Sequence, residues 1–254
     1  MTAPLFHLEP GALTGAVPGA EVSFGGPEAR HAAASMRLAP GESVLLADGS
    51  GVRGHGTVLA AAPDAVTVRL DAVDEEPAAV PALVLVQALA KGDRDLMAVQ
   101  AAVELGVDAV VPWEAERSIV RWKGPKAEKA RQKWADTARA AAKQARRARV
   151  PEVRGHVSGT GVAGLASAPD DGARLVLVLH EDAERGLSEV PVEWLREAAE
   201  IAVVVGPEGG VGPAELEACT AAGAVPVRLG PHVLRASTAG PAALAVLAHR
   251  LGRW

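Results

Sequence analysis

Two loops in the last third of the chain contain residues that could bind a ligand. The first, Gly206–Gly210, directly follows the apolar run Ile201–Val205 and contains the carboxylate of Glu208. Its adjacent glycines let the backbone come close to a ligand and present N–H groups to it. The second, Leu229–Ala239, leads into an expected helix and contains Arg235 just before that helix begins. Because the helix dipole disfavours a cation there, Arg235 indicates a bound anion or carboxylate.

The helix after the second loop also needs a cap. Ser237 or Thr238 is expected to provide it, because a hydroxyl at a helix start can accept an N–H bond from the first turn. An ordinary strand-to-helix connection, and an arginine that points into water, are the alternative interpretations of the two loops.

Other motifs are weaker indications of chemistry. Gly159–Gly164 and Gly49–Gly54 both match GxGxxG, but neither lies between a strand and a long helix, as a dinucleotide site requires. The chain has no P-loop and no GxSxG motif, and its seven histidines are dispersed. Its single cysteine, Cys219, is expected to be a small core residue. We therefore expect no metal site.

The segments around the two loops alternate between apolar strands and helices. This alternation is typical of a doubly wound parallel sheet, which places loops that follow its strands at one edge. Strands are expected at Leu83–Leu89, Asp108–Pro112, Leu175–Leu179, Ile201–Val205 and Val225–Leu229, and helices at Asp93–Leu105, Lys126–Arg149, Pro191–Ala199, Pro213–Ala222 and Ser237–Leu251.

The beginning of the chain has a different pattern. Short strand-like runs separated by Pro-Gly and Asp-Gly turns predict a small β-barrel over residues 1–74. An acidic, proline-containing linker follows at 75–81, and the α/β domain is expected at 82–254. The expected strands are Leu5–Leu8, Ala20–Phe24, Ser43–Ala47, Gly54–Leu59 and Ala65–Leu70, with one short helix at Pro27–Met36.

Positive charge is concentrated in one part of an acidic chain. Residues 117–154 contain 13 Lys or Arg and 3 Asp or Glu, a net charge of 13 − 3 = +10, although the whole chain carries −5. A localised basic surface suits a polyanion bound in one orientation. A solvated helix face is the alternative, but few acidic partners are available for ion pairs along this segment.

In their order and spacing, the two loops resemble the SPOUT class of methyltransferases, and most closely the ribosomal small-subunit uridine N3-methyltransferases (the RsmE family). The pattern departs from the family at Lys143, where Glu is usual, at His232, where Arg is common, and at Ala236-Ser237, which replaces Thr-Glu. Supporting stretches are Gln87–Arg94, Glu104–Val107, Glu116–Ser118 and Ala141–Pro151, with Met36-Arg37 and Asp48-Gly49 in the front domain.

The resemblance implies a PUA-like β-barrel followed by a SPOUT α/β domain with a trefoil knot, in a homodimer. It also implies S-adenosylmethionine as cofactor, held in a cleft that three loops form. The implied cofactor residues are Leu179, His180, Glu181, Gly206, Pro207, Glu208, Gly209, Gly210, Leu229, Gly230, Leu234, Ser237, Thr238 and Ala239.

The implied reaction is methylation of N3 of a uridine in 16S rRNA of the small ribosomal subunit. In it, Arg235 would stabilise the developing uridine anion or, alternatively, grip a phosphate or the cofactor carboxylate. Glu208 would orient the cofactor or act as a base. Basic residues of both domains would hold the RNA backbone. They are Arg37, Lys91, Arg94, Arg117, Arg146, Arg147 and Arg149.

The cellular setting and the alternatives follow from the same features. One cysteine, no signal-peptide pattern and no long uncharged apolar run favour a cytoplasmic protein that binds no membrane. The first alternative function is a SPOUT enzyme for another RNA target, a ribose 2′-hydroxyl or a guanine. The second is a non-enzymatic RNA-binding or assembly factor, and the third is a dehydrogenase built on Gly159–Gly164.

Overall fold

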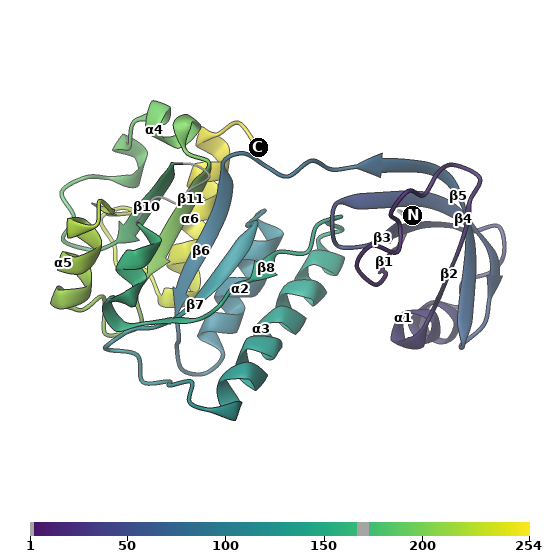
Figure 1. Cartoon of the computed structure of the whole chain (residues 1–254), viewed down its shortest axis with the longest axis horizontal. Helices are drawn as coiled ribbons and strands as arrows, with labels where there is room; N and C mark the ends of the chain where they lie inside the picture. Colours follow the sequence, from purple (N-terminus) through teal and green to yellow (C-terminus); the bar gives the residue numbers. More distant parts are fainter. Residues whose placement is uncertain (1–2, 167–172) are drawn as a thin grey trace. The chain divides into compact units, whose positions relative to one another are not determined.

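The computed structural model describes residues 3–166 and 173–254, which form two compact units (Figure 1). The first unit contains the chain up to Ala78 together with Ala142–Val150. The second contains the described residues of Ala79–Ala141 and Pro151–Trp254. The division expected from the sequence has no such interruption, so the segment Ala142–Val150 is an addition to the first unit.

The first unit is built on a five-stranded sheet in the order β1-β3-β4-β5-β2. All pairs are antiparallel except β1 with β3. Phe6, Leu46, Val58 and Val68 form its buried core. The predicted β-rich domain and its short helix are therefore confirmed. The elements are β1 (Leu5–His7), β2 (Glu21–Gly25), α1 (Gly26–Arg30), a π-helical turn (His31–Ser35), β3 (Ser43–Ala47), β4 (Val52–Ala61) and β5 (Ala65–Glu75).

The basic helix α3 (Pro125–Gln144) ends five residues before the predicted Arg149, so that boundary was wrong. Arg146 adopts a left-handed conformation, with φ of 57°, and the Arg147 N–H donates to the Ala142 carbonyl at 2.9 Å. This geometry closes a helix C-terminus without needing glycine. The chain then pairs with the β3–β4 loop, where the Val150 N–H donates to the Gly49 carbonyl at 3.0 Å.

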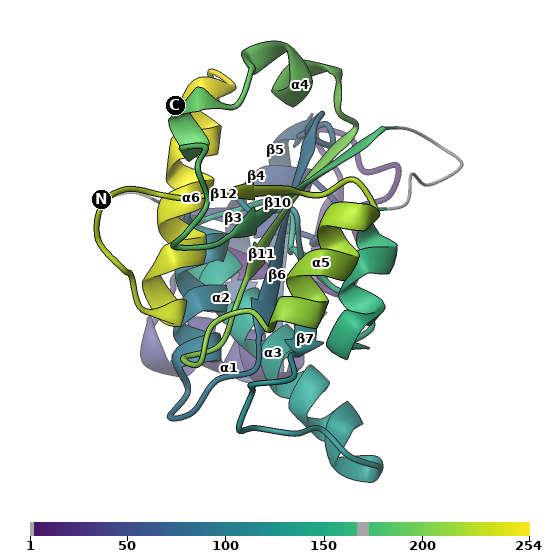
Figure 2. The ribbon, with the colours of Figure 1, turned by 90° about the vertical axis from the view of Figure 1, so that its left-hand side faces the viewer.

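The second unit contains a parallel sheet in the order β12-β10-β11-β6-β7-β8, with β9 also on β7. Helices α2 and α6 cover one face and α5 the other (Figure 2). The predicted doubly wound sheet is confirmed, and β8 and β9 are additional short strands. The elements are β6 (Ala82–Ala88), α2 (Arg94–Glu104), β7 (Ala109–Glu114), β8 (Glu152–Val153), β9 (Val157–Ser158), a 3-10 helix (Gly159–Leu165), β10 (Arg174–Leu179), a 3-10 turn (Leu187–Glu189), α4 (Val192–Glu197), β11 (Glu200–Val205), α5 (Pro213–Ala221), β12 (Val225–Val227) and α6 (Ala236–Arg250).

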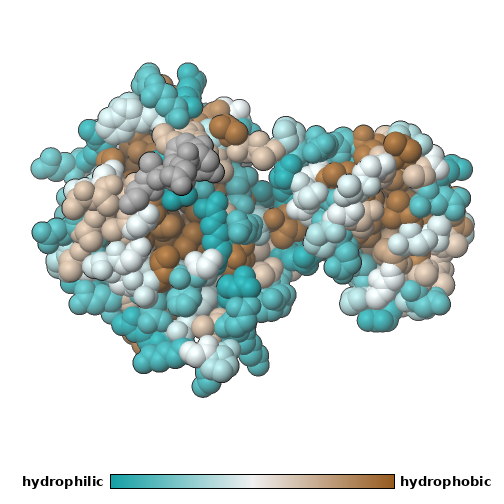
Figure 3. Space-filling model, viewed as in Figure 1, coloured by the Kyte–Doolittle hydropathy of each residue, from teal (hydrophilic) through white to brown (hydrophobic). Residues whose placement is uncertain are grey.

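Apolar residues are concentrated in the sheet. The central strand β11 is buried from Ile201 to Val205, as a strand covered on both faces must be. Hydrophilic residues cover most of the face in Figure 3, with apolar residues in the hollows between them. No helix in residues 3–166 and 173–254 is long and apolar enough to cross a membrane.

The trefoil knot that the family resemblance implies for the α/β domain stays a prediction.

Helix α6 begins close to the ends of the central strands. A Cβ atom on Gly240 would lie 2.7 Å from Leu85 Cδ1, so glycine permits this close packing. The helix begins at Ala236, and Arg235 is the cap residue without a side-chain cap bond. The prediction that Ser237 or Thr238 caps the helix was therefore wrong, because the helix starts earlier and both residues already lie in its first turn.

Candidate active site

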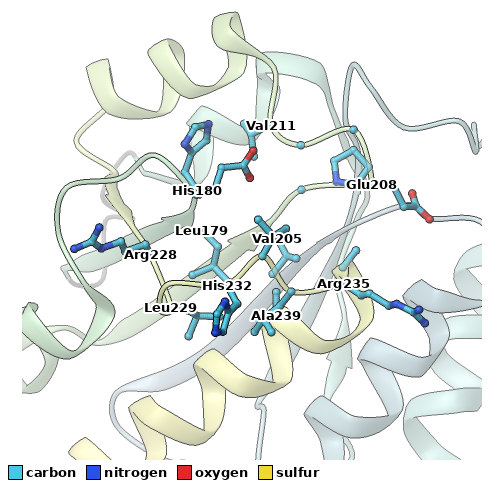
Figure 4. Close-up of a pocket in the computed structure, with 18 of the residues that line it drawn as sticks. Leu179, His180, Val205, Glu208, Val211, Arg228, Leu229, His232, Arg235 and Ala239 are labelled. Carbon is cyan, nitrogen blue, oxygen red and sulfur yellow. The ribbon is translucent and has the colours of Figure 1, made fainter.

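A cavity of about 500 Å³ lies at the carboxyl ends of β10, β11 and β12 (Figure 4). These strands are neighbours in the sheet and run parallel, so the loops that follow them meet at one edge. The cavity brings together twelve of the residues that the sequence assigned to a cofactor. They are Leu179, His180, Glu181, Gly206, Pro207, Glu208, Gly209, Gly210, Leu229, Gly230, Leu234 and Ala239.

Two of the expected cofactor residues, Ser237 and Thr238, are not among the described residues that line the cavity. Val211 and Arg228 line it, although the sequence had not assigned them to the cofactor, and so does His232 of the expected loop Leu229–Ala239. Arg228 could have been found, because it directly follows β12 at the same sheet edge as the other loops. Val211 carried no such signal, since its place depends on how tightly the preceding loop turns.

The loop after β11 favours glycine at two positions. A Cβ on Gly206 would lie 3.0 Å from the Val211 amide nitrogen, so a side chain there would crowd the backbone of the loop. Gly210 has φ of +76°, and its N–H donates to the Pro207 carbonyl at 2.9 Å. The loop is thus a tight turn that brings bare backbone to the cavity wall.

Glu208 is held by neighbouring groups. The Arg94 Nη1 atom donates to its carboxylate at 2.8 Å. Partial burial opposes ionisation, but the Glu208 backbone N–H, the Arg94 side chain and the Lys91 N–H outweigh it and lower the pKa of Glu208. The group is therefore a carboxylate near neutral pH and a weak base. This favours orientation over proton removal as its task.

Arg235 lies at the exposed start of α6 and lines the cavity. Figure 4 shows Arg235 and Glu208 on one side of the cavity and Arg228 on the other. Within residues 3–166 and 173–254, no hydrogen bond or ion pair engages the Arg235 guanidinium. Its charge is not neutralised by a described side chain, and the role of Arg235 in binding an anion stays a prediction.

Three of the basic residues assigned to RNA lie beside the cavity loop. Arg94 binds Glu208, and Arg117 Nη1 donates to the Gly209 carbonyl at 2.9 Å. Lys91 is exposed next to them. Arg94 and Arg117 thus have bonds within the protein that the sequence did not reveal.

The other four basic residues belong to the first unit. Arg37 and Arg146 are exposed and both have left-handed backbones. Arg147 is half-buried. Arg149 donates to the Glu76 carbonyl through Nε at 2.9 Å and Nη2 at 2.6 Å.

The two GxGxxG segments lie away from this cavity. Gly159–Gly164 forms part of a 3-10 helix after the short strand β9, and Gly49–Gly54 spans the turn after β3 and the first residues of β4. Neither is among the residues that line the cavity, in the part of the chain that the structure describes. They give no support to a dinucleotide site.

Comparison with known proteins assigns the parallel α/β unit, with its cavity at the strand ends, and the β-rich unit to the class of RNA methyltransferases. Residues 76–248 match the family model of the RNA methyltransferase domain, and residues 24–71 match that of the RNA methyltransferase PUA domain. The Ribosomal RNA small subunit methyltransferase E of Mycobacterium bovis is 38% identical over 254 residues, which cover 100% of this chain and 94% of the relative. The chain belongs to the ribosomal RNA small subunit methyltransferase E family.

Solved structures agree with this assignment. The enzyme of this name from Neisseria gonorrhoeae, bound to S-adenosylmethionine, is 27% identical with a TM-score of 0.82, and the match covers 98% of both chains. A Legionella pneumophila protein with bound S-adenosylmethionine is 28% identical, again with a TM-score of 0.82 and 98% coverage of both chains. The family resemblance seen in the sequence is thereby confirmed.

Proposed function

We propose that this chain transfers a methyl group from S-adenosylmethionine to N3 of a uridine in 16S rRNA of the small ribosomal subunit. The observation that carries the proposal is the cavity at the ends of β10, β11 and β12, which gathers most of the residues expected for the cofactor. Relatives that share the fold over 98% of their length bind S-adenosylmethionine. A relative with 38% identity is named for action on small-subunit ribosomal RNA.

The residues present fit this cofactor. A cavity of about 500 Å³ lies in the size range of small-molecule sites. Its walls combine apolar side chains, such as Leu179, Val205 and Leu229, with backbone groups of the glycine loop. Apolar walls suit a purine ring, and bare backbone supplies directional hydrogen bonds without crowding it.

The mechanism divides between the cofactor and the chain. When bound, S-adenosylmethionine supplies an electrophilic methyl group on a sulfonium. As the N3–methyl bond forms and the sulfonium–methyl bond breaks, the N3 proton of uracil would pass to solvent water. Its loss leaves negative charge shared with the two carbonyl oxygens, and the unpaired Arg235 guanidinium would stabilise that charge. Glu208, held ionised by Arg94, would keep the loop Gly206–Gly210 in place. Rate enhancement then depends mainly on how well the chain positions the two reactants.

The RNA would be held by basic side chains of both units. Arg37, Arg146 and Lys91 are exposed and are proposed to contact phosphates. Arg94 and Arg117 of the second unit, and Arg147 and Arg149 of the first, are proposed to contribute further contacts in addition to their bonds within the protein. The target uridine would have to leave its stack to reach the cavity.

We further propose a cytoplasmic homodimer whose α/β domain forms the trefoil knot, with no metal in the reaction. A second target class, a ribose 2′-hydroxyl or a guanine, would use the same cavity with different contacts to the base. A non-enzymatic assembly factor would not need an intact cofactor cavity.

The decisive experiment incubates the purified protein with methyl-labelled S-adenosylmethionine and small ribosomal subunits that lack their native modifications. Digestion to nucleosides and mass spectrometry then identify the labelled atom. Label on uridine N3 is expected. Label on a ribose or another base would replace the substrate proposal. Absence of both label and cofactor binding would refute the enzyme and favour an RNA-binding factor.

A further inference from the structure

Glu215 is a buried acidic residue that the proposed mechanism does not use. It lies in the first turn of α5, directly after the cavity loop, and is 1% exposed. Its Oε2 atom accepts the Gly212 N–H at 3.0 Å, and its Oε1 atom accepts the Glu116 N–H at 2.7 Å. One carboxylate therefore holds two segments of chain that are 99 residues apart.

Capping of α5 explains only half of this arrangement. A Glu at this helix position ordinarily accepts the N–H of the cap residue, here Gly212. Capping requires neither full burial nor the bond to Glu116. In the described part of the chain, no Lys or Arg pairs with Glu215, so backbone N–H groups and the start of the helix must compensate its charge. A charge buried in this way points to a role in fixing positions.

The two segments also meet at other atoms. Arg117 Nη1 donates to the Gly209 carbonyl at 2.9 Å, and a Cβ on Gly209 would lie 3.1 Å from Arg117 Cβ. A Cβ on Gly212 would lie 2.7 Å from Glu116 Oε2. The turn Glu116–Ser118 therefore lies against the cavity loop at several points, and Glu215 is the buried end of that contact.

We propose that Glu215 is a positioning residue that joins the cavity loop, residues 206–212, to the turn Glu116–Ser118 so that the two move together. This rests on the proposed function, since the loop is a proposed cofactor wall and Arg117 a proposed RNA contact. Binding of the cofactor would then order the turn that presents Arg117, and RNA contact at Arg117 would steady the cofactor loop. The coupling is reciprocal, as linkage requires.

Glu215→Gln tests the proposal with little change in shape. The amide has one acceptor oxygen, so one of the two N–H bonds is lost and the other is no longer charge-assisted. Glu217→Gln is the matched control, because Glu217 lies on the same helix, is exposed and loses the same charge. Hydrogen exchange without cofactor is measured for peptides covering 115–118 and 206–212, and the Kd for S-adenosylmethionine by calorimetry.

In Glu215→Gln, exchange should rise about tenfold in both segments, and the Kd for S-adenosylmethionine should rise about tenfold, since one charged hydrogen bond is worth that much. The KM for the cofactor should rise while kcat at saturation changes less than about twofold. Glu217→Gln should behave as wild type. Faster exchange in 206–212 alone, or in neither segment, would overturn the proposal and leave only a helix cap.

Glu215→Asp provides the second variant if Glu215→Gln does not fold. It keeps the charge but is one methylene shorter, so it cannot reach both N–H groups, and the same exchange criterion applies. If wild-type protein does not bind S-adenosylmethionine, the proposed function fails. The exchange measurement then still decides the role of Glu215, because it uses the protein without cofactor.

Discussion

Glu208 and Arg235 line the same cavity, but their surroundings give them different tasks. Arg94 binds Glu208 at 2.8 Å, so that carboxylate is already engaged in holding the loop. Arg235 has a free guanidinium among the described residues and lies at the exposed mouth of the cavity. The Arg235 guanidinium, which has no partner among the described residues, is therefore the charged group proposed to contact the substrate.

Arg235→Ala should therefore lower kcat by roughly a hundredfold, because loss of one charge-stabilising donor at a reacting centre typically costs that much. The Kd for S-adenosylmethionine and the Tm should change little. Initial rates at saturating cofactor on small subunits provide the measurement. Arg196→Ala, at an exposed position on α4 outside the cavity lining, is the matched control and should retain most activity. Wild-type kcat in Arg235→Ala would remove Arg235 from the mechanism.

Asp95, at the start of α2, is a buried carboxyl that should give the protein a measurable pH dependence. Burial raises its pKa, with a further contribution from the charge of Asp93, against N–H bonds from Leu96 and Ala90 that lower it. A raised pKa in the folded state favours the protonated acid. Its contribution to stability is thus present at low pH and is lost as the pH rises through the folded-state pKa.

Asp95→Asn can keep the 2.8 Å bond from the Leu96 N–H and loses only the long 3.4 Å bond from the Ala90 N–H. Because it also removes the buried charge, it should stabilise the protein by about 1 kcal/mol at pH 7. Urea unfolding at pH 7 and at pH 4 checks this, and the gain should shrink at the lower pH. Glu104→Gln, at the exposed far end of α2, is the control, because it removes one carboxylate from the same helix without touching Asp95. If Asp95→Asn instead lowers the free energy of unfolding, by the same amount at pH 7 and pH 4, the hydrogen bonds of Asp95 matter more than its buried charge.

At the scale of elements, the end of α3 shows how a departure from the family pattern is accommodated. Lys143 Nζ contacts Glu28 Oε2 at 2.7 Å and lies 5.4 Å from the centre of the Phe6 ring. Both charged side chains are about three-quarters buried, with 27% and 28% exposed. The lysine is thus bound within the first unit, where it attaches the last turn of the helix to α1.

Lys143→Met should destabilise the protein by about 1–2 kcal/mol, because Glu28 would be left partly buried without its cation. Glu28→Gln should lower the free energy of unfolding less in the Lys143→Met protein than in wild type. The difference is the coupling free energy, expected to be about 1 kcal/mol. Urea unfolding of the four proteins measures the cycle. Lys129→Met, at an exposed position on α3, is the control. Additive effects would show that the ion pair contributes nothing.

At the scale of the whole molecule, the first unit is discontinuous in sequence. Ala148 is fully buried against Leu5 and Ala47, and Arg149 forms a β-bridge with Gly49. The segment Ala142–Val150 therefore belongs to the first unit, although more than sixty residues of the second unit precede it in the sequence.

A fragment of residues 1–80 should consequently be less stable than the same unit in the full chain, since it exposes the apolar surface around Leu5 and Ala47. A peptide of residues 139–152 should bind the fragment and restore a cooperative urea transition. The same peptide with Ala148→Asp should not. A fragment that is fully stable and ignores the peptide would contradict this account of the unit.

The sequence alone determined the strands, the order of the helices and the edge where the site lies. Buried parallel strands appear as short apolar runs such as Ile201–Val205, and their carboxyl ends share one edge for geometric reasons. The glycine loop and Arg235 were therefore found from local pattern and spacing. Helix ends were less well determined. Helix α3 ends with Arg146 in the left-handed conformation, where glycine would have been the usual sequence signal.

Only the tertiary structure decided which charged groups are already paired. Arg94 and Glu208 are 114 residues apart, and Lys143 and Glu28 are 115 apart. A charge in a sequence indicates affinity for an opposite charge, but its partner is set by how the chain packs. The same arginine pattern is thus compatible with RNA contact or with an internal bond, and the structure supplies the internal bonds of Arg94 and Arg117.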